Sequence, residues 1–172
     1  MQYIGRSFTI WAIVSKLKKG FNEVKEIDNA LTELRKVTDE TEATYKNFLQ
    51  TMSKSGEAIG SPVKDLTSSA ADWARLGYSI EEAGKLAENT MVLMNVSEFS
   101  SVSDATDSMI SALQAFKDED SDIDTLSKKI IDVYNQIGNN YAISTSDLAD
   151  SLTRSSASLV AANNTLEQSV AL

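Results

Sequence analysis

The sequence predicts an all-α protein in which a long N-terminal helix is followed by a bundle of short antiparallel helices. Its 172 residues include one proline, Pro62, and only 7% aromatic residues, which is unlike a turn-rich β fold. Apolar residues recur every three or four positions along most of the chain, as on one face of a helix. Serine followed three residues later by an acidic residue is found at the start of several of these stretches, and this spacing is typical of helix N-termini.

The first twenty residues form an apolar and basic segment. The run Phe8–Val14 follows Arg6 and precedes the sequence KLKK, which contains Lys16, Lys18 and Lys19. This run is far shorter than the ~20 apolar residues that span a bilayer, and a basic stretch stands where a signal peptide has its cleavage site. We expect an anchor that docks on this protein or on a neighbouring copy, or else the cut end of a longer hydrophobic segment.

Residues 21–54 are predicted to form a long helical arm. Its apolar residues follow an a/d heptad pattern and form a candidate self-association seam: Val24, Ile27, Leu31, Leu34, Tyr45, Phe48 and Met52. Thr38 and Thr41 interrupt this stripe. Three interpretations remain open: a coiled coil between copies, a helix that packs against its own domain, or a break at the threonines where one helix ends and another begins.

Residues 61–172 are predicted to form a domain of short helices. Ser61 is expected to cap the first of them, with Pro62 in its first turn and Gly77 after its end. Later helices are expected to start at the pairs Ser79–Glu82, Ser101–Asp104, Ser121–Asp124 and Ser144–Asp147. Predicted helix ends are Gly56 with Gly60, Asn95 and Gly138, and a last segment is predicted from about Ser155 to Leu172. Because its apolar pattern has no terminal cap, we expect the chain to be a piece of a longer polypeptide.

Charge and composition exclude several classes of function. Residues 1–54 carry nine basic and seven acidic side chains, whereas residues 55–172 carry seven basic and 18 acidic ones, for a net charge of −9 overall. An acidic domain of this kind is a poor candidate for direct binding to nucleic acid. The absence of both cysteine and histidine removes thiolate sites and histidine-dependent catalysis. We therefore predict a protein that is not an enzyme and has no cofactor or small-molecule substrate.

The acidic stretch after residue 117 is the strongest candidate for a metal site. It partly matches a calcium-binding loop, whose first, third and fifth ligand positions would be Asp118, Asp120 and Asp122. Ile123 stands where that loop needs glycine, and Lys129 stands where it needs a bidentate glutamate. We expect no metal here, and interpret the stretch, including Glu119 and Asp124, as a loop and an acidic first helical turn.

Other residues that suggest chemistry have simpler structural explanations. Glu81 and Glu82 are adjacent on a helix and face different directions, so they cannot share a substrate. Trp73 and Tyr78 have the spacing of core aromatics more than that of a stacking platform. A methionine set, expected to fill the core in preference to lining a peptide groove, consists of Met91, Met94 and Met109.

Three segments resemble the core region of phage tail tape measure proteins, of the type found in phages and prophages of Gram-positive bacteria. They are IDNALTELRKVTDET at Ile27–Thr41, ADWARLGYSIEEAGKLAENTMVLMNVSE at Ala71–Glu98 and IGNNYAISTSDLADSL at Ile137–Leu152. The family-motif residues among them are Trp73, Gly77 and Ser79. The likeness covers most of the chain from about Lys25, although tape measure proteins are usually much longer than 172 residues.

This resemblance implies a structural role in the virion tail. The protein would occupy the lumen of the growing tail tube, help to set tail length while tube subunits polymerise around it in the host cytoplasm, and leave with the DNA at infection. Its implied partners are the tail tube protein, tail assembly chaperones, tail-tip proteins and other copies of itself. The alternatives are a bacterial helical adaptor or secreted helical-hairpin protein, and a membrane-active or lytic module, which the run Phe8–Val14 supports weakly.

Overall fold

The structure is a computed structural model that describes residues 4–117, 122–141 and 143–172, with side chains described from Gly20 onward except that of Phe21. Over these ranges the fold is all-α, as the sequence predicts. The eight helices of the described chain are α1 (Ile4–Val37), α2 (Glu42–Ile59), α3 (Val63–Arg75), α4 (Ile80–Asn95), α5 (Val102–Phe116), α6 (Ile123–Asn140), α7 (Thr145–Ala161) and α8 (Leu166–Val170).

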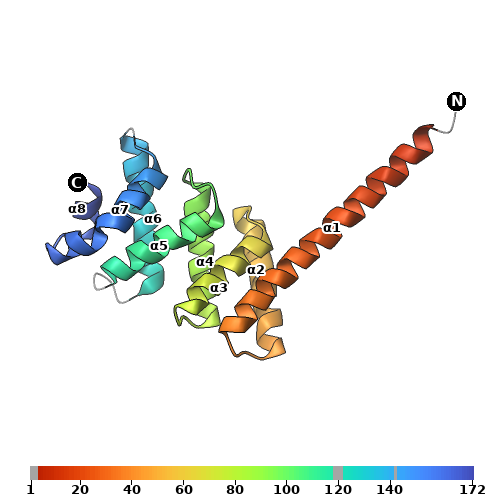
Figure 1. Cartoon of the computed structure of the whole chain (residues 1–172), viewed down its shortest axis with the longest axis horizontal. Helices are drawn as coiled ribbons and strands as arrows, with labels where there is room; N and C mark the ends of the chain where they lie inside the picture. The colour runs from red at the N-terminus through yellow and green to blue at the C-terminus, as the bar shows by residue number, and fades with distance from the viewer. Residues whose placement is uncertain (1–3, 118–121, 142) are drawn as a thin grey trace.

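The helices pack in two rows. The odd-numbered helices α1, α3, α5 and α7 contact one another in that order, and the even-numbered helices α2, α4, α6 and α8 do the same. From α2 onward each helix also contacts the helix that follows it in the chain. The bundle is therefore a stack of helical pairs that advances from the N-terminal to the C-terminal end, with α1 projecting from one side (Figure 1).

The predicted arm over residues 21–54 is divided between α1 and α2. The Thr38 hydroxyl donates to the Leu34 carbonyl at 2.8 Å and lies 2.8 Å from the Tyr45 hydroxyl, so both threonine and tyrosine stabilise the corner. Thr41 then caps α2 by accepting a hydrogen bond from the Thr44 amide. The arm therefore breaks at the threonines, and its apolar residues on both sides of the break pack against the chain's own bundle, so 21–54 is not a single long helix separate from the bundle.

Several predicted helix starts and ends are confirmed. Ser79, Ser101 and Ser144 cap α4, α5 and α7, each accepting a hydrogen bond from the amide three residues later. Asn95 is the last residue of α4, and Gly60 follows α2 in a left-handed conformation with φ of 72°.

Other predicted boundaries are wrong by small amounts. Pro62, not Ser61, is the residue before the first turn of α3, and no side chain caps that helix. Asp122 takes the capping role predicted for Ser121, which lies outside the described residues, because its carboxylate accepts from the Asp124 and Thr125 amides. Gly138 is inside α6, which ends at Asn140.

The helix that starts at Ser144 is also longer than predicted. Ser155 does not begin a new segment, because α7 continues through it to Ala161. Its hydroxyl donates to the Ser151 carbonyl four residues earlier at 2.7 Å, which satisfies the polar side chain inside the helix.

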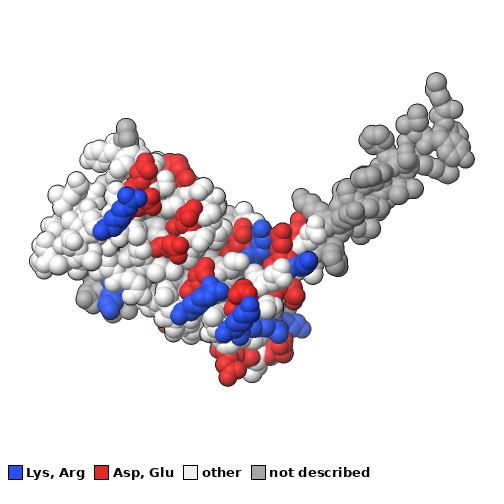
Figure 2. Space-filling model, in the orientation of Figure 1, with Lys and Arg blue, Asp and Glu red and all other residues white. Residues whose placement is uncertain are grey.

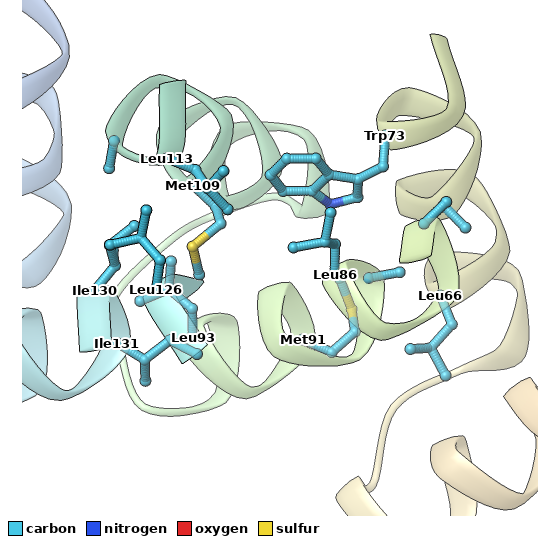
Figure 3. Close-up of a cluster of buried hydrophobic side chains, with 14 of the residues drawn as sticks. Leu66, Trp73, Leu86, Met91, Leu93, Met109, Leu113, Leu126, Ile130 and Ile131 are labelled. Carbon is cyan, nitrogen blue, oxygen red and sulfur yellow. The ribbon is translucent and has the colours of Figure 1, made fainter. Parts of the chain in front are cut away.

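A single apolar core runs along the stack. Trp73 points from α3 toward Leu86 of α4, while Met109, Leu126 and Ile130 continue the core across α5 and α6 (Figure 3). Many of the remaining interior positions are alanine, serine or threonine, so the helices approach one another closely. The core therefore depends on a few large side chains set among small ones.

Candidate functional site

The family-motif residues lie at the turn between α3 and α4. Gly77 has φ of 93°, a left-handed conformation that favours glycine, and its amide donates to the Ala74 carbonyl at 2.9 Å. The next helix begins with a capping box, in which Ser79 and Glu82 each accept a hydrogen bond from the other's amide. The hydrogen bonds from Ser79 hold the pKa of Glu82 below its usual range. These residues build a rigid hairpin and expose no reactive group.

Trp73 holds this hairpin from inside. Its side chain is 0% exposed, and its indole N–H donates to the Thr90 hydroxyl of α4 at 3.3 Å. The Tyr78 ring meets it edge-on, with ring centroids 5.7 Å apart and planes at 71°. Burial raises the pKa of the Tyr78 hydroxyl. The pair is therefore a packing element, as the sequence favoured, and Trp73 has no free face for a ligand.

The three methionines of the predicted set also serve packing. Met91 and Met109 are fully buried in the core, and Met94 is half-buried at the edge of α4. They fill space between large and small neighbours and line no open peptide groove.

The candidate seam is split by the structure. Five of its seven residues, Leu31, Leu34, Tyr45, Phe48 and Met52, are buried in the core of the chain itself. Ile27 is half-buried, and Val24 is 66% exposed. A partner could thus reach only the N-terminal end of the seam without unfolding the bundle. Self-association of the chain remains a prediction.

The described part of the acidic stretch, from Asp122 onward, contributes to helix capping and packing. Residues 118–121 of the candidate calcium loop lie outside the described residues, whereas Asp122 caps α6. The Asp124 carboxylate accepts from Lys128 at 2.6 Å and from the Asn89 amide at 2.8 Å, and these two bonds hold its pKa below the usual range. Lys129 pairs with Glu167 at 2.9 Å. Within the described ranges no group of acidic side chains is arranged to hold a metal ion.

Hydroxyl and amide side chains join successive helix pairs, a feature that sequence reasoning missed. Ser69 of α3 and Thr106 of α5 are buried with their hydroxyls 3.0 Å apart. Asn89 of α4 donates to the Ser127 hydroxyl of α6 at 2.7 Å as well as to Asp124. The helical period places these polar residues on the apolar faces of their helices. That position in the sequence could have indicated that they are buried and hydrogen-bonded.

A groove with four carboxylates lies between α5 and α7. Its volume is about 480 Å³, and its acidic members are Glu98, Asp104, Asp107 and Asp150. Figure 2 shows acidic side chains gathered over this face. The Thr145 amide donates to Glu98 at 2.9 Å, and Ser100 donates to Asp104 at 3.2 Å, so two of the carboxylates also stabilise nearby backbone and loops. The groove gives this face a negative potential and contains no nucleophile activated by a base.

A second groove, of about 590 Å³, is found where α1 leaves the bundle. It is formed by Glu23, Glu26 and Ile27 on one side and by Pro62 and Val63 on the other. Lys64 reaches across it to Glu26 at 3.2 Å. The run Phe8–Val14 precedes this point on α1, and its side chains lie outside the described ones. None of the helices in the described part of the chain is both long and apolar enough to cross a membrane.

Comparison with known proteins identifies a family. A family model described as phage-related minor tail protein matches residues 49–172, which is more than half of the chain and extends from within α2 to the end of α8. No solved structure matches the chain. The matched residues include the α3–α4 turn with Trp73, Gly77 and Ser79, whereas all of α1 precedes them.

Proposed function

The chain belongs to the phage-related minor tail protein family and is thus a phage tail component, and from this premise we propose that it is the core part of a tail tape measure protein. The observation that carries the proposal is the match over residues 49–172, which covers the stacked helical pairs from α3 to α8. In this role the protein is structural and non-enzymatic. It resides in the lumen of the tail tube, helps to set tail length and leaves with the DNA.

The two-row packing supports this role physically. A stack in which each helix contacts only near neighbours in sequence grows along one axis, which suits a protein confined to a narrow tube. The proposed partners are the tail tube protein, which would polymerise around the chain, together with assembly chaperones, tail-tip proteins and other copies of the chain. The Gram-positive type of phage is part of the same proposal and rests on the segment Ile27–Thr41.

The test is a change of length in the phage gene that encodes the chain. An insertion of four heptads into α1 adds 28 residues, which as helix rise about 42 Å. The control inserts the same 28 residues at the exposed turn before Thr165, where they add nothing to the long direction of α1. Tail lengths are measured by electron microscopy of purified particles.

The two insertions give opposite expectations. If the chain is part of the ruler, the α1 insertion lengthens the tails by about 40 Å, and the control leaves them unchanged. Normal tails of unchanged length from both insertions would show a tail component that does not measure length, and would overturn the tape measure proposal.

A further inference from the structure

Two grooves of similar size lie between successive helices of the odd-numbered row. The groove between α1 and α3 has a volume of about 500 Å³, and the groove between α5 and α7, called the acidic groove below, has about 480 Å³. In the first groove the Lys64 ammonium lies 3.2 Å from the Glu26 carboxylate and 4.0 Å from that of Asp65. Lys36 also lines this groove and pairs with Glu33. The carboxylates of the first groove are therefore neutralised by lysines of the chain itself.

The acidic groove has carboxylates but no such lysine. Ser146 is the second residue of α7 and lines this groove, whereas Lys64 is the second residue of α3. None of the described residues that line the acidic groove is basic. Of its four carboxylates, only that of Asp150 forms an ion pair with another described residue, at 3.7 Å from the exposed side chain of Arg154. The chain thus leaves most of the negative charge of this groove without a counter-charge.

The wall of the acidic groove also contains an unsatisfied hydroxyl. Ser69, the seventh residue of α3, has its hydroxyl 3.0 Å from that of Thr106, the fifth residue of α5. The same positions in α5 and α7 are Ser108 and Ala149. Ala149 has no hydroxyl to offer, and Ser108, which is 5% exposed and lines the groove, makes no hydrogen bond of normal geometry with a described atom. The contact between α5 and α7 therefore lacks the polar link that joins α3 to α5.

The excess negative charge extends beyond the groove. Burial raises the pKa of Asp72 in α3, and the Asp107 carboxylate of the groove raises it further, although Arg75 lowers it. Acidic side chains gather over this face in Figure 2, and residues 55–172 carry 18 acidic and only seven basic side chains. A cation from outside the chain is therefore the complementary ligand for this face.

Exposed apolar side chains lie at one end of the acidic groove. The Thr145 amide at the start of α7 donates to Glu98 in the loop before α5 at 2.9 Å, so the α4–α5 and α6–α7 loops meet there. The exposed large apolar side chains of these two loops are Val96, Tyr141 and Ile143. A small polyamine would leave them uncovered, whereas a protein segment has apolar side chains of its own that can cover them.

We propose that the acidic groove binds a basic segment of a partner protein, whose lysine or arginine side chains pair with Asp104, Asp107 and Asp150. The partner supplies the cation that Lys64 supplies in the groove between α1 and α3, and its charged groups form charge-assisted hydrogen bonds with the carboxylates. Apolar residues of the same segment cover Val96 in the adjoining loop. This binding surface goes beyond the proposed role in tail length and does not depend on it.

Calorimetric titration of the full chain tests the proposal with a defined probe. The probe is a blocked octapeptide in which lysine alternates with valine, and its control has glutamate in place of lysine. We expect the lysine peptide to bind, the glutamate peptide not to bind, and spermine, which carries the same number of ammonium groups, to bind at least about tenfold more weakly than the lysine peptide. Spermine that binds as tightly as the peptide would overturn the protein segment as the ligand.

A lysine built into the acidic groove should compete with the probe. Ser146→Lys places an ammonium group where α3 has Lys64, so it should weaken binding of the lysine peptide about tenfold. The matched control, Ser158→Lys, makes the same change of charge at an exposed position about 18 Å further along α7 and should leave the affinity within about twofold of the wild type. Circular dichroism melting curves verify that both variants fold.

Removal of carboxylates should have the same effect without adding a side chain. Asp107→Asn combined with Asp150→Asn should weaken peptide binding about tenfold, whereas Asp132→Asn on the exposed side of α6 should change it by less than about twofold. A lysine peptide that does not bind the wild type would overturn the proposal. So would equal binding by the wild type, the Ser146→Lys variant and the double asparagine variant. None of these measurements involves tail length, so failure here is distinguishable from failure of the tape measure role.

Discussion

The two halves of the bundle differ in whether their buried polar side chains are hydrogen-bonded. In the half from α1 to α4, the Trp73 indole donates to Thr90, and the Tyr45 hydroxyl donates to the Thr38 carbonyl at 3.1 Å. In the half from α5 to α8, the buried hydroxyls of Ser108, Tyr134 and Ser169 make no hydrogen bond of normal geometry with a described atom, although the Ser108 side chain is near enough to Tyr134 to act on its pKa. An unpaired buried hydroxyl costs about 1–3 kcal/mol.

Two parts of a helical bundle with similar apolar packing can therefore differ in their free energy of unfolding. Both halves combine a few large apolar side chains with many small residues, so their apolar burial is of the same kind. Both halves contain satisfied polar contacts, such as that of Ser127 in α6, but the unsatisfied hydroxyls of the described residues all lie in the second half. We therefore expect α5 to α8 to open before α1 to α4, which predicts faster amide hydrogen exchange in the second half.

The largest expected effect is at the centre of the first half. Trp73→Ala removes a fully buried indole and its bond to Thr90, and should lower the free energy of unfolding by about 3–5 kcal/mol. Urea denaturation followed by circular dichroism measures the loss. A loss under about 1 kcal/mol would mean that the α3–α4 hairpin does not depend on this side chain. It would contradict the higher stability expected for the first half.

The next effect concerns the second half at alkaline pH. Burial raises the pKa of the Tyr134 hydroxyl to about 12, above its value of about 10 in an unfolded chain. Because the folded state favours the protonated form, this contribution is intact below pH 10 and is lost between pH 10 and 12, at up to ~1.4 kcal/mol per pH unit. The Tyr134→Phe variant should lose less stability than the wild type over that range. Parallel curves for the two proteins would contradict the deep burial of this group.

A third pair of changes compares close helix contacts. A Cβ at Gly56 would lie 2.6 Å from the Ser61 carbonyl oxygen, which is backbone and cannot turn aside, whereas a Cβ at Gly138 would lie 2.8 Å from the Thr145 hydroxyl, which can rotate. Gly56→Ala should therefore cost about 1–3 kcal/mol. Gly138→Ala should cost less, because the better helix propensity of alanine offsets part of the strain. Thermal unfolding of the two variants measures both losses of stability. Equal losses would show that the backbone contact at Gly56 is no more restrictive than the side-chain contact at Gly138.

The smallest effect is the most direct test of the comparison. Tyr45→Phe removes a hydroxyl that bonds at the Thr38 corner and should cost about 1 kcal/mol at pH 7. Tyr134→Phe removes a hydroxyl that makes no hydrogen bond of normal geometry with a described atom, and should leave stability unchanged or raise it by up to ~1 kcal/mol. If both changes destabilise equally in urea denaturation, the two halves do not differ in the way proposed.

Local signals were enough to predict much of the fold. The serine caps of α4, α5 and α7 and the left-handed Gly77 follow from chemistry within four residues, so the sequence shows them directly. Errors arose where two local signals compete. Ser155 resembles a helix start, but its hydroxyl bonds to the preceding turn, and Asp122 is a capping residue next to the serine that was expected.

The partner of each apolar face could not be predicted in this way. The heptad that contains Leu31 and Leu34 shows which side of the helix is apolar, but the same pattern fits a second copy or the chain's own α3. The choice depends on contacts distant in sequence. The hydrogen bonds from Asn89 to α6 could not be predicted for the same reason, because the position of a polar residue on an apolar helix face does not identify the atom that accepts its hydrogen bond.

The two-row order of helices also has a consequence for synthesis. Within the described residues, the main contacts of each helix are with helices one or two places before and after it, so a helix that leaves the ribosome meets its earlier neighbours already made. The chain can therefore fold progressively from α1 and α2 toward α8 while translation continues, with little exposed apolar surface waiting for distant residues. A host cell could thus hold a folded N-terminal part of this protein before the C-terminal part has been translated.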